Sequence, residues 1–523
     1  MPTFIDGQQN LSSLQVPGVY IDIIPPQPTV IGSATNFEGL VGVGSWGPVN
    51  APQYFSTPDQ CSTLFGTPQV RDHDIATHVW AASQVGGSVG FVGVRVTDGT
   101  DVAATGNLGG ATALTLTAKH TGTLGNSITA TIGAGTAPNS YSISISFPGK
   151  APEVFNNITG TGNAFWVNAA AAINNGSAVR GASTVVVAAA GASITAPTVG
   201  STATLAGGSD GATGVVAATL MGVDTTPRTG MYALRRTGID CFTLIDLTDS
   251  TTWAAQASFA LSENCVAVGA MAKGTSVSAA IAARVTAGLD AFQFWLIAGD
   301  WPTFYDSQNG YARLVAPTAF ALGLAGNLSP EQSPLNKPLN GVVATQASQA
   351  GTTYSDAELA LAEQGGIDLI VGPPVTPGGS YFTFITGRNA SSNTSANGIE
   401  YSRLTFFLAR SLQSAAAGKI VGSLQSIQAG DQTRMRAKAL VDGFLAAIKN
   451  PSSGSNGYGM IDDFSTQCDL TNNPASLQQR GFLFLYAKVL YLNAVRYFVV
   501  KLAGGGNVQV STQQTAPSAQ QFL

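Results

Sequence analysis

Charged side chains are scarce in this sequence. Asp, Glu, Lys and Arg make up 10% of its 523 residues, whereas they supply roughly 25% of an ordinary soluble protein. Gly, Ala, Ser and Thr fill the difference. A surface with so few charged side chains is typical of a subunit that is packed against other subunits in an assembly. A secreted protein with a surface rich in Ser and Thr is the alternative interpretation.

We also expect no disulfides, no leader and no membrane span. The four cysteines lie far apart and form no CxxC pair, so we expect buried thiols in a reducing compartment. The first residues, MPTFIDGQQ, contain neither a basic nor an apolar stretch, so we expect no secretory signal. No run of about 18 uncharged apolar residues occurs, so we expect no transmembrane helix.

Two short patterns match known cofactor-binding or catalytic motifs, but the predicted secondary structure around each of them does not fit the motif. Gly42-x-Gly44-x-x-Gly47 resembles a dinucleotide loop, but Pro48 follows it and no helix begins there to bind a phosphate. Residues 86–90 match GxSxG, yet their order is helix, turn, strand, whereas a nucleophile elbow needs strand, turn, helix. We therefore expect no cofactor.

Two carboxylates keep an enzyme open as an alternative. Asp246 and Asp300 follow predicted strands in a region where strands and helices alternate, and α/β active sites lie at such strand ends. Asp246 also begins the run DLTDS, which is equally typical of a helix cap. The spacing of the histidines does not favour a metal site; they are His73, His78 and His120.

The net charge of −5 conceals an uneven distribution. Residues 396–523 contain eleven Lys and Arg against six Asp and Glu, so a basic C-terminal quarter follows an acidic remainder. Such asymmetry predicts an oriented contact, either with an acidic protein surface or with nucleic acid. The aromatic residues of this quarter lie in apolar strands rather than between the basic residues, which disfavours stacking on nucleic acid.

Hydrophobic periodicity divides the chain into regions. From about 216 to 395, predicted strands and helices alternate, which indicates a mainly parallel sheet covered by helices. Residues 99–215 hold few charges and several alternating apolar stretches, which is typical of an inserted β-rich domain. Beyond 396, the spacing of apolar residues predicts helices over 403–413 and 432–449.

The C-terminal end holds the densest apolar and aromatic run, residues 481–510. We expect strands at about 482–492 and 496–502, because β-branched and aromatic residues dominate, although so apolar a run also permits a helix. A glycine hinge and a short strand follow, and that strand must pair with a sheet edge in its own subunit or another. The hinge is Gly504, Gly505 and Gly506; the strand is Asn507, Val508, Gln509 and Val510.

A second extended segment lies near the N-terminus. Residues 1–16 are polar and mixed, Pro17-Gly18 interrupts the chain, and Val19, Tyr20 and Ile21 begin a predicted strand. Extended segments near both ends predict a subunit that is linked to copies of itself.

Several motifs resemble the tail sheath proteins of contractile-tailed phages and related injection machines. The resemblance covers about 1–98 and 216–523, whereas the insert resembles nothing specific. The motifs are PGVY at 17–20, GLVG at 39–42 with WGP at 46–48, RLVAP at 313–317, SPLNK at 333–337, YSDAE at 354–358 and GRN at 387–389.

The resemblance implies a fold of mixed α/β class (α+β multidomain), with a discontinuous inner domain that both chain ends build. The predicted parts are an N-terminal arm (1–18), an inner tube-proximal domain (19–87 and 396–502), a middle α/β domain (88–98 and 216–395), an inserted β-rich protruding domain (99–215) and a C-terminal arm (503–523).

It also implies a structural role without catalysis or a cofactor. Subunits of that family stack as hexameric rings around a tail tube, add arm strands to neighbouring sheets, and contract to drive the tube through the host envelope. The implied partners are further copies of the chain, the tail tube protein, and baseplate and tail terminator proteins, with no nucleic acid and no membrane insertion. The implied location is the virion, after assembly in the host cytoplasm.

Basic residues at the start of the predicted helix 432–449 are candidates for the tube contact. Arg434 and Lys438 are four residues apart and share a helix face, while Arg436 points elsewhere. Exposed ion pairs are worth only about 0–1 kcal/mol each, so they can hold register and still release during contraction. Ordinary solvated helix charges are the alternative interpretation.

Overall fold

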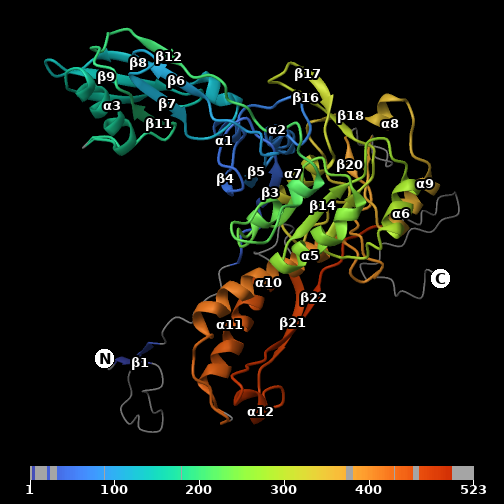
Figure 1. Ribbon diagram of the computed structural model, residues 1–523. Helices are drawn as coiled ribbons and strands as arrows, with labels where there is room; N and C mark the ends of the chain where they lie inside the picture. Colours follow the sequence, from blue (N-terminus) through green and yellow to red (C-terminus); the bar gives the residue numbers. More distant parts are fainter. Residues whose placement is uncertain are drawn as a thin grey trace, which may run out of the picture.

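The computed structural model describes residues 3–5, 21–23, 32–87, 89–177, 179–372, 381–428, 430–450 and 459–497. Figure 1 shows three parts: a central body, a lobe on one side of it and a leg that extends away from it. We call residues 99–211 the lobe and residues 399–491 the leg; the remaining residues from 32 to 398 form the body.

A six-stranded sheet forms the centre of the body. Five strands run parallel, and one edge strand is antiparallel to its neighbour. Four of the parallel strands are buried along their whole length, which explains their continuous apolar sequences. In spatial order the strands are β15 (Phe294–Ile297), β14 (Val266–Ala270), β13 (Cys241–Leu244), β3 (Phe37–Gly42), β5 (Gly90–Arg95) and β4 (Gln53–Phe55).

Helices cover both faces of this sheet, as the alternation of strands and helices predicts. One face packs against α1 (Pro58–Phe65), α2 (Ile75–Gln84) and α7 (Thr318–Asn327). The other face packs against α5 (Trp253–Glu263) and α6 (Val277–Thr286). The remaining helices of the body are α4 (Ala217–Met221), α8 (Gln346–Gln349) and α9 (Asp356–Gly365).

Two small sheets complete the body beside α7. Three antiparallel strands pair in the order β17-β16-β18, and a further pair joins β19 to β20. These strands are β16 (Pro302–Asp306), β17 (Tyr311–Leu314), β18 (Val342–Thr345), β19 (Ile370–Val371) and β20 (Thr383–Phe384).

The lobe is rich in β-structure, as predicted. One antiparallel sheet has the order β10-β9-β8-β12 and the other β11-β7-β6, and both share a single apolar core with α3. Trp46, which comes from the body, completes this core 4.9 Å from the ring of Phe147. The elements are β6 (Thr105–Leu108), β7 (Leu114–Ala118), β8 (Thr129–Ala134), β9 (Tyr141–Ser146), β10 (Glu153–Ile158), α3 (Asn163–Asn175), β11 (Val186–Ala190) and β12 (Thr202–Thr204).

The leg consists of two long helices and a β-hairpin. Helix α10 (Ile399–Lys419) begins beside the body and runs along the leg, and α11 (Gln432–Lys449) lies beside it. The hairpin is β21 (Ile461–Gln467) and β22 (Tyr486–Tyr491), and a short helix, α12 (Ala475–Gln478), lies between the two strands in sequence. The bounds of α11 are those predicted from the sequence.

The predicted inner domain needs a correction. It grouped residues 19–87 with 396–502, but β3 pairs with β13 and β5, and β4 pairs with β5. Residues 37–87 therefore belong to the same sheet and core as the α/β region, whereas Ser33, just before them, donates to the Ser411 hydroxyl of α10 at 2.9 Å. An apolar strand sequence predicts burial, but it does not identify the partner strand.

The predicted C-terminal strands are also corrected in part. A strand does form within 482–492, although it is shorter than predicted, and Arg496 and Tyr497 carry no regular structure. The rest of the second predicted strand, residues 498–502, lies outside the described residues.

Candidate assembly interface

The hairpin of the leg is a two-stranded antiparallel sheet. Its register runs from Ile461 opposite Tyr491 to Gln467 opposite Tyr486, with a bulge near Asp463. Among the described residues, no third strand joins either edge. Because an isolated hairpin is marginally stable and an open edge presents unpaired backbone groups, this sheet can accept strands from another chain.

One face of the hairpin is covered by helices of the leg. Phe464, Val489 and Tyr491 pack against an apolar cluster that α10 and α11 build. The other face is open, and the side chains of Tyr486 and Leu490 are 55% and 57% exposed there. The cluster comprises Leu404, Phe407, Leu408, Phe444, Leu445, Ile448 and Ile461.

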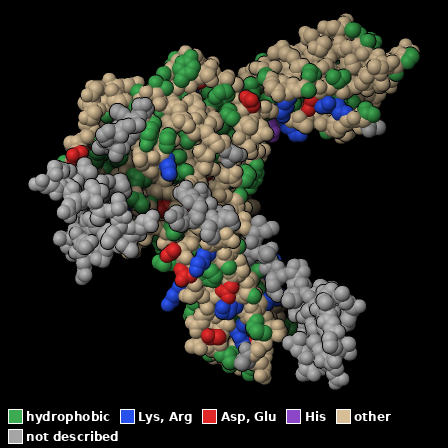
Figure 2. All heavy atoms as spheres, turned by 180° about the vertical axis from the view of Figure 1, so that it is seen from behind, with side chains coloured by type: hydrophobic (Ala, Val, Ile, Leu, Met, Phe, Trp, Pro, Cys, Tyr) green, Lys and Arg blue, Asp and Glu red, His purple; other side chains and the backbone are tan. Residues whose placement is uncertain are grey.

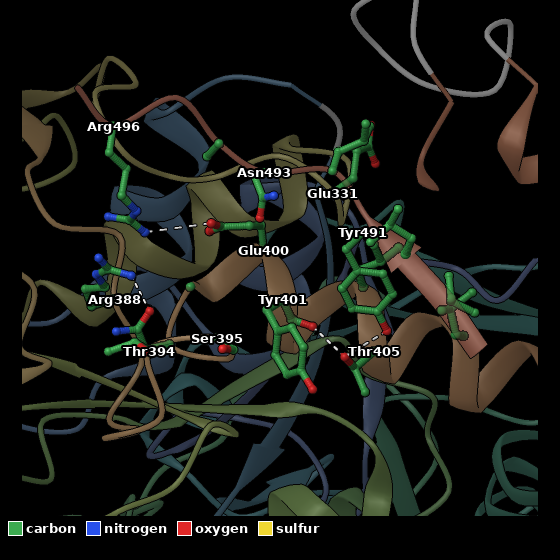
Figure 3. A pocket seen from close by; sticks show the side chains of 18 of the residues that line it. Glu331, Arg388, Thr394, Ser395, Glu400, Tyr401, Thr405, Tyr491, Asn493 and Arg496 are labelled. Atoms are coloured by element: carbon green, nitrogen blue, oxygen red, sulfur yellow. Dashed lines mark hydrogen bonds and ion pairs between the residues drawn. The ribbon is translucent and has the colours of Figure 1, made fainter. Parts of the chain in front are cut away.

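A groove of about 700 Å³ lies between α10 and β22. Its apolar part is lined by Leu404, Leu408 and Val489. Tyr491 bounds the middle, with its hydroxyl 3.1 Å from the Thr405 hydroxyl, and burial raises the pKa of Tyr491. Figure 3 shows this pair and the polar end of the same groove.

Arg388, Arg496 and Glu400 line the polar end of the groove. Arg388 donates to Glu363 at 2.7 Å, and Arg496 lies 3.5 Å from the same carboxylate and 3.7 Å from Glu400. Arg496 also donates to the Thr386 carbonyl at 2.6 Å. These contacts tie the chain just after β22 to the body.

The predicted arm residues lie mostly outside the described part of the chain. Val19 and Tyr20 are outside it, and so are the whole hinge and the strand Asn507–Val510. Ile21 opens β2 (Ile21–Ile23), which pairs in parallel with β1 (Thr3–Ile5) of the same chain.

The tube-facing candidates need one correction. Arg434 does not lie on an exposed face, because its side chain is only 2% exposed. Its guanidinium donates to the Ser426 carbonyl at 2.6 Å and to the Gln428 carbonyl, and so it fixes the loop before α11. Asp431 caps the helix by accepting the Arg434 backbone N–H.

The other two candidates remain at the surface. Arg436 is exposed and donates to the Lys419 carbonyl. Lys438 is 43% exposed and forms an ion pair with Asp442 at 2.6 Å. Figure 2 shows that the leg, seen from behind, carries Lys and Arg side chains next to Asp and Glu side chains.

Asp246 and Asp300 both serve as backbone acceptors. Asp246 accepts the His73 N–H at 2.8 Å, and Asp300 accepts the Ala347 N–H at 2.9 Å. His78 lies 3.7 Å from Asp246, and burial lowers the pKa of this histidine. Neither carboxylate lies beside a nucleophile that the hydrogen bonds of the described residues would activate.

A single group of side chains in the described ranges is compact enough for a metal ion, namely Glu38, Asp240 and Cys241. Asp240 already binds the guanidinium groups of Arg403 and Arg410 at 2.8 and 2.6 Å. Because two cations occupy this carboxylate, the group does not fit a metal site. Within the same ranges, no helix is both long and apolar enough to cross a membrane.

Arg403, Arg410 and Arg496 were not predicted from the sequence as functional positions. Arg403 and Arg410 are seven residues apart, so they share a face of the predicted helix. Two arginines on an otherwise apolar face are a usable signal of a buried carboxylate partner. No local pattern marks Arg496, whose partners are all distant in sequence.

Solved structures with a similar fold are tail sheath proteins. The sheath tail protein of Listeria innocua is 14% identical, with a TM-score of 0.58 over 88% of this chain and 96% of its own. That of Desulfitobacterium hafniense is 15% identical, with a TM-score of 0.53 over 86% and 93%. The contracted helical sheath of the anti-feeding prophage is 11% identical, with a TM-score of 0.53 over 94% and 100%.

No protein-family model matches the sequence, and no curated protein matches it either. The structural likenesses nevertheless cover most of the body, lobe and leg together. They show that the chain has the fold of sheath tail proteins, none of which is described as an enzyme.

Proposed function

We propose that this chain, with its sheath tail protein fold, is the structural subunit of a contractile phage tail sheath. Its copies polymerise as stacked hexameric rings around a tail tube, and contraction drives the tube through the host envelope during genome delivery. The partners are further copies of the chain, the tube protein, and baseplate and tail terminator proteins. The site of action is the virion, and the subunit uses no cofactor.

The observation that carries this proposal is the open hairpin of the leg. In the described part of the chain, this two-stranded sheet has both edges free, so it is incomplete as a folding unit and extended segments from other copies can complete it. Val508 and Val510 alternate with polar residues, so they can face the apolar groove while the backbone pairs with the edge. The low charge of the chain agrees with a surface that is largely covered in an assembly.

Electron microscopy of the purified full-length chain tests this function directly. Striated tubes or stacked rings are the expected result. A stable monomer at every concentration and salt condition, also in the presence of tail tubes, would refute it.

Two truncations test the role of the C-terminal arm. Removal of residues 504–523 deletes the hinge and the strand, and we expect a folded monomer that does not polymerise. Removal of residues 512–523 keeps both, and we expect normal assembly. Equal assembly of the two shortened chains would show that Asn507–Val510 does not link subunits.

The tube contact of the proposed sheath involves the exposed basic residues of α11. Arg436 and Lys438 remain available at the surface, whereas Arg434 is used inside its own subunit. Exposed ion pairs of about 0–1 kcal/mol each add up over many rings and weaken with salt. This behaviour fits a contact that must hold before contraction and release during it.

A charge reversal tests this contact. Arg436→Glu with Lys438→Glu is expected to leave the monomer folded and to reduce the coating of tubes at low salt. The matched control is Lys150→Glu with Lys273→Glu, which makes the same change of charge on the lobe and the body. Equal coating of tubes by both double variants would exclude this helix as the tube contact.

A further inference from the structure

The chain returns from the leg to the body immediately after β22. Residues 492–497 form no regular structure, and Val495 and Tyr497 are 78% and 79% exposed. Between them, the Arg496 side chain is only 16% exposed. The Arg496 side chain is therefore mostly buried between two neighbours whose side chains are exposed.

We propose that Arg496 anchors this segment to the body and so fixes the point from which residues 498–523 reach another copy of the chain. The inference rests on the proposed function, because it gives a positioning role to a residue next to the C-terminal arm. The inference concerns the subunit that donates the arm strand, whereas the hairpin belongs to the subunit that accepts this strand.

The Arg496 guanidinium donates a hydrogen bond to the Thr386 carbonyl and lies 3.5 Å from the Glu363 carboxylate and 3.7 Å from the Glu400 carboxylate. Glu363 belongs to α9, Thr386 follows β20, and Glu400 lies in the first turn of α10. Figure 3 shows Arg496 directed toward Glu400 at the polar end of the groove. A planar guanidinium can bridge two carboxylates and a carbonyl at once, whereas a lysine ammonium offers a single point of charge.

The contacts of Arg496 determine where the C-terminal arm starts on the subunit, not whether the arm can link two subunits. Residues 498–523 are long enough to reach in many directions if they start from a free end. When the start is fixed on the body, the segment leaves every subunit from the same place relative to β21 and β22. A regular lattice needs this uniformity, because each arm must meet the hairpin of one particular neighbour.

The test compares full-length Arg496→Gln, Arg496→Lys and Arg480→Gln with the parent chain. Arg480 is an exposed leg arginine whose described contact is with the Phe482 ring, so its variant is the matched control. We expect at least a tenfold lower sedimentable fraction for Arg496→Gln, an intermediate value for Arg496→Lys, and the parent value for Arg480→Gln. Circular dichroism should show the same folded monomer in all four.

A mixing experiment separates positioning from simple destabilisation. Arg496→Gln copies keep an intact hairpin, so they accept arms from parent copies but present their own arms wrongly. A small fraction of the variant should therefore shorten parent tubes, whereas an unfolded variant would be inert. If Arg496→Gln does not fold, Glu400→Gln replaces it and should shorten tubes in the same way.

Two outcomes overturn the inference. Parent-like assembly of Arg496→Gln would show that the anchor is dispensable, and a folded variant that never affects parent tubes would show that its role is structural only. Absence of tubes from the parent chain itself would instead refute the proposed function.

Discussion

Arg403 Nε lies 2.8 Å from Asp240 Oδ2, although 163 residues separate the two along the chain. Both side chains are almost completely buried. Arg410, two turns further along α10, donates to the other oxygen of the same carboxylate at 2.6 Å. Because Asp240 immediately precedes β13, this triad fastens the first half of the leg helix to the sheet of the body.

Asp240→Asn should destabilise the protein strongly, because it leaves two buried guanidinium groups without their counterion. Breaking a buried pair in this way typically costs about 3–5 kcal/mol. Urea unfolding of the dilute full-length chain measures the loss. The matched control is Asp224→Asn, an exposed carboxylate that also pairs with two arginines and should cost about 0–1 kcal/mol. Equal losses would contradict the interpretation of the triad.

Glu38→Gln should change how stability depends on pH. Burial and the neighbouring charge of Asp240 raise the pKa of Glu38 well above its ordinary value. The folded state therefore binds a proton that the unfolded state has released, and stability falls as the pH rises toward the folded pKa. Asp240 does not titrate in this range, because Arg403 and Arg410 outweigh burial and lower its pKa.

Between pH 5 and pH 8 the parent should therefore lose more unfolding free energy than Glu38→Gln, by up to about 1.4 kcal/mol per pH unit. Gln keeps an oxygen that can accept the Cys241 N–H, which Glu38 accepts at 2.9 Å. Urea unfolding at several pH values measures both slopes. Parallel slopes would show that Glu38 does not titrate differently in the folded and unfolded chain.

Trp46→Ala should loosen the lobe from the body. Trp46 is buried in the lobe core, and the backbone carbonyl of Ser45 accepts the Leu124 N–H at 3.0 Å. Loss of a buried tryptophan costs about 3–5 kcal/mol. We expect faster proteolysis within residues 99–211 and a lower unfolding free energy, with Trp46→Phe in between. An unchanged cleavage rate would mean that the lobe folds independently of this side chain.

Arg434→Gln should destabilise the tip of the leg without acting through charge at the surface. The substitution removes hydrogen bonds to two loop carbonyls, and each charge-assisted bond is worth about 1.5–3 kcal/mol. Hydrogen exchange in residues 421–428 should accelerate. Lys438→Gln, on the same helix but paired with Asp442 four residues along it, is the control and should leave the exchange unchanged. Similar exchange in both variants would restore Arg434 as a surface residue.

Local sequence patterns determined the elements. The apolar spacing of Leu440, Phe444 and Ile448 predicted the bounds of α11, and Ser355 with Glu358 forms a capping box at the start of α9. These features depend on neighbours within a turn or two, so the sequence contains all that is needed to predict them. The low charge and the open hairpin agree on a role in an assembly.

Tertiary structure alone decided which elements meet. Helical spacing put Arg434 and Lys438 on one face, but a loop folds over Arg434 and turns it into a buried residue. The same limit explains why β3 was assigned to the wrong unit and why Arg496 went unnoticed. Their partners lie far away in the sequence. An apolar pattern predicts that a residue is buried, but it does not predict which element that residue packs against. The leg shows this most clearly, since one face of its hairpin packs on α10 and α11 while Tyr486 and Leu490 on the other face are exposed in the described chain.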